Sequence, residues 1–183
     1  MAKFEIELRG RLTLDQKNKL QDFLCTNGKL VREYERTQWC FGLSHDKKID
    51  LRIKKTNGQA EFSLKVGRLG NANRKEISIP ILPDKVDQAF EFLKFLGHRE
   101  GVKAIRNAKI YTYKNIEWAI VEVPNHSFYF EAEILVDNKS DGIAAQEEIR
   151  RVADELFLKV DSPNEIVEYI KILDKEANKL FKL

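Results

Sequence analysis

Residues 3–9 read KFEIELR, and their polar and apolar side chains alternate as they do in a β-strand. With the two-residue period of a strand, Glu5, Glu7 and Arg9 lie on one face and the apolar residues lie on the other. The two carboxylates are about 7 Å apart along such a strand, so they repel each other. A neighbouring positive charge or a metal ion is the expected reason for tolerating them.

A second acidic strand is expected nearer the other end of the chain. Residues 130–134 read FEAEI and put Glu131 and Glu133 on one face of that strand. Together the two stretches could offer four carboxylates to one divalent ion. Two half-solvated strands with charged outer faces explain the same pattern, and the pattern alone does not separate these interpretations.

The composition restricts the classes of protein to consider. The 183 residues are enough for one domain with a sizeable core, and 32 basic against 29 acidic residues leave a net charge of only +3. This mixed charge is not that of a polybasic DNA-binding protein. Two cysteines are too few for a disulfide framework, and the sequence contains neither a signal peptide nor an apolar run of about 18 residues. We therefore expect a cytoplasmic protein with reduced thiols that associates with neither DNA nor a membrane.

The rest of the sequence predicts a mixture of strands and helices. Asn57-Gly58 indicates a hairpin turn, and Gly28 and Gly97 are expected to end helices. Helices are expected over residues 13–28, 83–97 and 140–158, and from Ser162 to the C-terminus. Strands are expected over residues 30–43, 50–54, 61–66, 74–79, 102–114, 116–123 and 127–136. We predict a single α+β domain over residues 1–183, with about eight antiparallel strands within residues 3–136 and a helical tail over residues 140–183.

Basic side chains occupy alternate positions of the middle strands. Arg52, Lys54 and Lys65 alternate with apolar residues, so they share a face that differs in charge from the acidic strands. On an open sheet this face would meet water. If the sheet instead closes into an eight-stranded antiparallel barrel with helices outside, acidic and basic residues share one lumen. Such a lumen suits a ligand with many negative oxygens, because lysines and arginines neutralise phosphates and glutamates hold Mg²⁺ or Mn²⁺.

Five elements, in this order, resemble the CYTH family, the triphosphate tunnel metalloenzymes, which includes class IV adenylate cyclases, thiamine triphosphatases and inorganic triphosphatases. The elements are EIELR (residues 5–9, with arginine where the family has lysine), DLRIK (residues 50–54), Lys65, RKE (residues 74–76) and EAE (residues 131–133). The resemblance covers roughly residues 3–136, and the helical tail is also similar.

The resemblance implies a tunnel that binds a triphosphate, with roles for individual residues. Residues implied to bind phosphates are Arg52, Lys54, Lys65, Arg74 and Lys103. Residues implied to hold Mg²⁺ or Mn²⁺ are Glu5, Glu7, Glu131 and Glu133. Residues implied to take part in catalysis are Glu7, Arg9, Glu76 and Arg106. Lys103 and Arg106 are three residues apart where the family usually has a spacing of two, so only one of them is expected to point inward unless a bulge intervenes.

The chain also departs from the family pattern. Val121 stands two positions before Val123, where the family commonly has an acidic residue, and Glu122 is one place off. Residues 37–39 replace the family's aspartate-aromatic ending of that strand, which puts recognition of a base or an alcohol in doubt.

These observations favour a divalent-metal-dependent hydrolase of a triphosphate, either inorganic triphosphate or a small organic triphosphate such as thiamine triphosphate. One alternative is a class IV adenylate cyclase that makes cyclic AMP from ATP. Another, suggested by Val121, is a catalytically weak module that binds polyphosphate or a nucleotide. The expected partner is a triphosphate-containing small molecule, and the choice between monomer and homodimer stays open.

Overall fold

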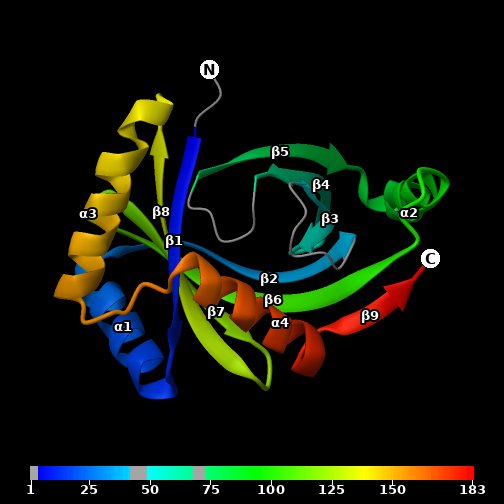
Figure 1. Ribbon diagram of the computed structural model, residues 1–183. Helices are drawn as coiled ribbons and strands as arrows, with labels where there is room; N and C mark the ends of the chain where they lie inside the picture. The colour runs from blue at the N-terminus through cyan, green and yellow to red at the C-terminus, as the bar shows by residue number, and fades with distance from the viewer. Residues whose placement is uncertain (1–3, 42–48, 68–72) are drawn as a thin grey trace.

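The computed structural model describes residues 4–41, 49–67 and 73–183, except for the side chains of Asn73, Arg74 and Lys139. Within these residues it contains one antiparallel sheet and four α-helices, so the α+β prediction is confirmed (Figure 1). The strands are β1 (Phe4–Leu12), β2 (Lys29–Phe41), β3 (Ile49–Thr56), β4 (Gln59–Val66), β5 (Asn73–Ile81), β6 (Glu100–Tyr113), β7 (Ile116–Val123), β8 (Ser127–Val136) and β9 (Lys179–Lys182). The helices are α1 (Leu14–Asn27), α2 (Val86–Phe95), α3 (Gly142–Glu155) and α4 (Pro163–Glu176).

The sheet is strongly curled rather than fully closed. Its strand order is β2-β3-β4-β5-β1-β8-β7-β6-β9, and β2 also pairs with β6. The β2–β6 ladder is long, running from Lys29↔Thr112 to Phe41↔Gly101. Between β1 and β5, however, the described residues pair only at Glu5↔Arg74 and Ile6↔Asn73. The predicted closed eight-stranded barrel is therefore confirmed only as a curled antiparallel sheet, because these are the two positions at which the described residues of β1 and β5 pair.

The alternation of side chains in β1 separates an apolar exterior from a polar interior. Ile6, Leu8 and Leu12 are buried on the outer face, where they join a core with Leu24 of α1 and Ile149 of α3. In Figure 1, α3 runs beside β1 and β8 on that outer side. Because the period is two, the alternate positions of β1 point inward. Packing of helices on the outer face thus decides which side chains line the interior.

Two helix starts agree with the sequence prediction. Thr13 caps α1 in a capping box with Gln16, and Ser162 caps α4 in the same way with Glu165. A smaller core fixes α2 on the outside of β2 and β3, where Ala89 and Leu93 pack with other buried residues.

The C-terminus differs from the prediction. The sequence predicted a helix from Ser162 to the end of the chain, but α4 ends at Glu176 and β9 follows it. The reason lies in β6, whose first residues pair with β2 on one side but lie before the β7 ladder, which begins at Asn107. This leaves one edge of β6 for β9, which pairs from Glu100↔Lys182 to Lys103↔Lys179. Backbone hydrogen bonds to this edge stabilise residues 179–182 as a strand. They outweigh helix propensity, which is a weak preference that tertiary contacts commonly override.

In the described part of the chain, none of the helices combines the length and the apolar character needed to cross a membrane.

Removing core volume from α3 should destabilise the fold. Ile149 is fully buried in the core between α3 and the sheet, whereas Ile143 of the same helix is 71% exposed. We predict that Ile149→Ala lowers the free energy of unfolding by about 2–5 kcal/mol. The matched variant Ile143→Ala should change it by less than about 0.5 kcal/mol. Urea denaturation measures both, and equal effects would contradict this packing.

Candidate functional site

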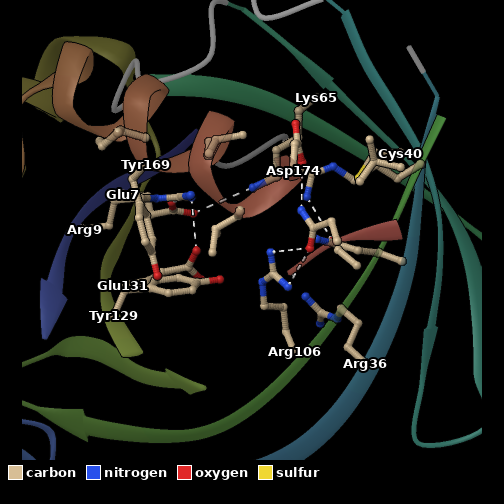
Figure 2. Close-up of a pocket in the computed structure, with 18 of the residues that line it drawn as sticks. Glu7, Arg9, Arg36, Cys40, Lys65, Arg106, Tyr129, Glu131, Tyr169 and Asp174 are labelled. Atoms are coloured by element: carbon tan, nitrogen blue, oxygen red, sulfur yellow. Dashed lines mark hydrogen bonds and ion pairs between the residues drawn. The ribbon is translucent and has the colours of Figure 1, made fainter. Parts of the chain in front are cut away.

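The interior of the curled sheet holds two neighbouring cavities of about 260 and 150 Å³. The larger one is lined mainly by acidic and basic side chains at the N-terminal end of β1. The smaller one lies between the strands and α4 (Figure 2). Six residues line both cavities, so the two form one continuous polar interior: Glu7, Tyr34, Arg36, Lys54, Lys65 and Glu131.

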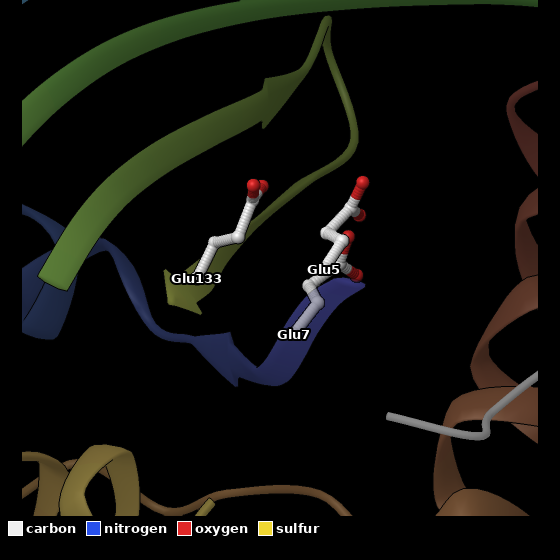
Figure 3. A group of neighbouring side chains, drawn as sticks. All are labelled: Glu5, Glu7 and Glu133. Carbon is white, nitrogen blue, oxygen red and sulfur yellow. The ribbon is translucent and has the colours of Figure 1, made fainter. Parts of the chain in front are cut away.

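Three carboxylates converge in the larger cavity. Glu5 and Glu7 of β1 lie next to Glu133 of β8, with one oxygen of each within 4.8 Å of the others (Figure 3). The ladder explains this, because Glu7 and Glu133 are directly opposite each other. Three oxygen donors at this spacing fit a hard divalent cation such as Mg²⁺ or Mn²⁺. Glu131, the fourth predicted ligand, lies outside this cluster.

The acid cluster has perturbed protonation. Burial, which outweighs the attraction of Lys65, raises the pKa of Glu5 to about 7. Burial and then the negative charges of Glu5 and Glu7 raise the pKa of Glu133 to about 8. Both shifts show carboxyl groups that resist ionising next to one another. A cation bound between them would relieve this repulsion.

Arg9 connects two of the predicted acids. Its guanidinium is hydrogen-bonded to Glu7 and lies 3.1 Å from an oxygen of Glu131. Burial alone would raise the pKa of Glu7, but Arg9 and Lys65 outweigh it and lower that pKa to about 2. Burial and the charge of Glu7 raise the pKa of Glu131. Glu7 is therefore ionised at neutral pH.

Lys65 occupies the centre of the charged interior. Its Nζ lies 3.0 Å from Oε1 of Glu5 and 3.1 Å from Oε2 of Glu76, with Oε2 of Glu7 at 3.7 Å. Its ammonium thus compensates the acidic cluster in this structure, much as a bound cation would.

Glu76 has further partners on β3 and β4. Lys54 and Ser63 each donate to its Oε1 at 2.6 Å. Although burial opposes it, the attraction of Lys65 and Lys54 lowers the pKa of Glu76.

Arginines lie deeper, toward α4. Arg52 lines the smaller cavity, donating to Asp50 at 2.8 Å and to Gln38 at 3.0 Å. Arg106 is buried and donates to Oδ1 of Asn178, just beyond α4, at 3.1 and 3.2 Å. The backbone of Arg74 pairs with Glu5, but its side chain lies outside the described part of the structure.

Lys103 is not part of this interior. Its ammonium lies 5.5 Å from the ring centroid of Trp39 and it is absent from the lining of both cavities, whereas Arg106 lines the smaller one. The odd spacing of the two residues on a regular strand puts them on opposite faces. Arg106 is therefore the inward member of the pair, and the structure does not bring Lys103 together with the other residues that the resemblance assigned to phosphate binding.

Val121 occupies the position at which the CYTH family commonly has an acidic residue. It is fully buried with Ala108, Ile110 and Ala119, and Tyr34 and Tyr129 pack against this cluster. Glu122 is exposed. One wall of the interior is therefore apolar.

Sequence reasoning missed several residues of the interior. Arg36 and Tyr34 come from β2 and line the smaller cavity. The pairing register of β2 with β6 shifts between Leu30 and Arg32, and this shift changes which residues of the strand point inward. Tyr169 and Asp174 come from α4, which we predicted only as part of a tail. For Arg36, the alternation of polar residues along β2 was an available signal. For α4, an apolar stripe indicates packing but does not say against which surface.

The raised pKa values predict how stability depends on pH. Between pH 4.5 and about 8, the folded protein keeps protons on Glu5 and Glu133 that the unfolded chain has released. Because the folded state then binds more protons, the free energy of unfolding should fall as the pH rises through this window. Thermal unfolding of the metal-free protein should show a midpoint that falls by a few degrees toward pH 8.

Glu133→Gln should flatten this pH profile, whereas Glu35→Gln, at an exposed position of β2, should leave it unchanged. A Glu133→Gln profile as steep as that of the native protein would contradict the assignment.

No protein-family model and no curated protein sequence matches the chain. Solved structures do. The PH1819 protein from Pyrococcus horikoshii OT3 superposes with a TM-score of 0.72 and 23% identity, over 91% of this chain and 99% of that one. A candidate adenylate cyclase from Vibrio parahaemolyticus gives 0.66 and 16%, over 92% and 99%. HpAC1 from Hippeastrum, a candidate adenylyl cyclase described as having a dominant triphosphatase activity, gives 0.55 and 13%, over 87% and 90%.

The likeness extends over most of each chain, and at these identities it establishes the fold. The neighbours include CYTH-type proteins. This chain therefore has the CYTH-type fold that residues 5–9 and 131–133 indicated.

Proposed function

We propose that this protein is a divalent-metal-dependent hydrolase that binds a triphosphate inside the curled sheet. The observation that carries the proposal is the convergence of three carboxylates with several lysines and arginines in one cavity. A chain of phosphates needs both kinds of group, because its oxygens bind directly to lysine and arginine and, through a metal ion, to carboxylates.

Glu5, Glu7 and Glu133 would hold Mg²⁺ or Mn²⁺. Glu131 is connected to this group by Arg9, which contacts both Glu131 and Glu7. The bound ion would neutralise negative charge on the phosphate oxygens during phosphoryl transfer. When the carboxylates gain a cation, Lys65 loses its role as their counter-charge. It would then be released toward the phosphates, close to Lys54 and Arg52.

The reaction we propose is attack of water on a terminal phosphorus atom with cleavage of the phosphoanhydride bond. Glu76 is ionised and held by Lys54 and Lys65, so it can orient the attacking water. Arg9 keeps Glu7 ionised and oriented, while Arg52, Arg74 and Arg106 would stabilise charge on the transferred group. A bound phosphate chain would also bridge β1 and β5, and we include in the proposal that it closes the sheet into a tunnel.

Hydrolysis is favoured over cyclisation, because cyclisation also requires a site that positions a ribose and a base. Hydrolysis needs only the phosphate-binding cations, the metal ligands and a water. The dominant triphosphatase activity described for HpAC1, which shares the fold, supports the same choice. A small triphosphate as substrate and a cytoplasmic location stay predictions.

The second candidate is an adenylate cyclase, favoured by the candidate cyclase from Vibrio parahaemolyticus among the similar structures. One experiment separates the candidates. The purified protein is incubated with inorganic triphosphate, thiamine triphosphate or ATP in the presence of Mg²⁺ or Mn²⁺. Phosphate, diphosphate and cyclic AMP are then measured in parallel. Cyclic AMP with diphosphate would reverse our ranking. Thermal stabilisation by a ligand without any product would identify a binding module. The apolar wall around Val121 is the observation that favours this alternative.

Loss of one carboxylate should abolish metal-dependent turnover. Glu7→Gln removes a negative ligand and the partner of Arg9, and we expect turnover to fall by about 100-fold or more. Glu122→Gln, on the same sheet but exposed, should retain full turnover. Initial rates at saturating Mg²⁺ and Mn²⁺ measure both variants, and an active Glu7→Gln protein would refute the ligand assignment.

Two lysines provide a matched test of phosphate binding. Lys65→Met removes an inward ammonium, and we expect affinity for inorganic triphosphate to fall by about tenfold or more, the value of a charge-assisted contact. Lys103→Met removes a lysine from the opposite face and should leave the affinity unchanged. Calorimetric titration measures both. Equal losses would mean that overall charge, rather than the interior site, sets the affinity.

A further inference from the structure

A short chain of hydrogen bonds connects the end of α4 to Arg106 of β6. Oδ1 of Asn178 accepts from both terminal nitrogens of Arg106, at 3.2 Å from Nη1 and 3.1 Å from Nη2. Nδ2 of the same amide donates to Oδ1 of Asp174 at 2.8 Å. All three residues line the smaller cavity, and the two charged ends of the chain, Arg106 and Asp174, are labelled in Figure 2.

The backbone around Asn178 explains why its side chain reaches Arg106. Asn178 lies between α4 and β9, and its backbone amide donates to the carbonyl oxygen of Leu173 at 2.7 Å. The next residue, Lys179, pairs with Lys103 of β6, the strand that also carries Arg106. The pairing of β9 with β6, which the sequence did not predict, therefore places the amide beside the guanidinium.

The two neighbours of the amide determine its orientation. A guanidinium only donates hydrogen bonds, and an ionised carboxylate only accepts them. The carbonyl oxygen of Asn178 therefore faces Arg106, and its NH₂ group faces Asp174. The reverse orientation would place donors against donors and acceptors against acceptors. Asp174 thus fixes which end of the amide Arg106 meets.

The amide holds Arg106 without cancelling its charge. Other cations of the interior, such as Arg9 and Lys54, contact a carboxylate directly. Arg106 is only 7% exposed, yet its hydrogen bonds go to Asn178 and to the carbonyl oxygen of Ile105, and among the described residues it forms no ion pair. A neutral acceptor satisfies the N–H groups and leaves the positive charge available to an anion in the cavity.

We infer that Asn178 and Asp174 are positioning residues for Arg106. Asn178 holds the guanidinium in place as a neutral acceptor, and Asp174 keeps the amide turned the right way. Its negative charge stays one side chain away from the arginine. This inference rests on the proposed function, in which Arg106 stabilises charge on the transferred phosphoryl group. The two residues act through Arg106 and not on the ligand.

The test exchanges the two side chains. In the double variant Asn178→Asp with Asp174→Asn, the amide at position 174 can donate to the carboxylate at position 178. Net charge, shape and hydrogen bonds are retained, but the negative charge now lies against Arg106. Calorimetric titration with a triphosphate that has imido bridges, which resist hydrolysis, measures affinity in the presence of Mg²⁺. We expect the double variant to bind about tenfold more weakly than the native protein. The thermal midpoint of its ligand-free form should not fall, because the guanidinium gains a counter-charge.

A mutant cycle tests whether Asn178 acts through Arg106. Asn178→Ala should weaken binding of the same ligand about fivefold or more in the native background. In an Arg106→Gln background it should weaken binding little further, because the group that it positions is gone. The matched variant Glu176→Gln removes an exposed carboxylate from the end of the same helix and should leave the affinity unchanged.

Each outcome has a distinct meaning. Native affinity in the double variant would overturn the inference and leave the proposed function intact. If the double variant loses stability, the cycle decides: additive losses would show that Asn178 serves only the fold, and non-additive losses would support positioning. A native protein that neither binds the imido ligand nor hydrolyses inorganic triphosphate would overturn the proposed function itself.

Discussion

The contacts of Lys65 with Glu5 and Glu76 are the interaction on which the interior depends. Carboxylates that far apart in the sequence come together only because β4 lies beside β5, and β5 meets β1. Without an ammonium between them, several acids would share a partly buried space, which is costly unless they become protonated. The charge balance of the interior is therefore also a link between β4 and β1, because Lys65 reaches from β4 to Glu5 of β1. Among the described residues, the backbones of β1 and β5 pair at two positions beside this contact.

Burial of apolar side chains on the outer face of the strands offsets the energetic cost of a polar interior. The apolar residues of β1 pack under α1 and α3, so most of the hydrophobic stabilisation comes from outside the curl. The inward face is then free to carry side chains that would weaken an ordinary core. Tyr34 and Tyr129 border the charged groups and an apolar wall at the same time. The interior thus has a charged side and an apolar side. This asymmetry restricts the orientation of an elongated anion inside it.

Local rules accounted for much of the fold. Alternation in residues 4–12 and 127–136 correctly predicted which faces carry Glu7 and Glu131, and the capping residues Thr13 and Ser162 correctly predicted two helix starts. Properties set by distant contacts were not predictable. The short β1–β5 ladder depends on how far the strands diverge, and β9 forms because β6 leaves an edge available. The pairing of Arg36 with Arg106 required the register of β2 against β6, which the spacing of residues in one strand does not contain.

In the described part of the chain β1 and β5 pair at two positions, and this short ladder has a consequence for the behaviour of the protein in concentrated solution. A strand with an unpaired edge offers hydrogen-bonding groups to neighbouring molecules and is a common starting point for aggregation. β5 carries Pro80 within this stretch, and proline has no amide hydrogen to donate. Lys75 adds a charge near the start of the same strand. These two residues oppose the joining of sheets between molecules along this edge of β5.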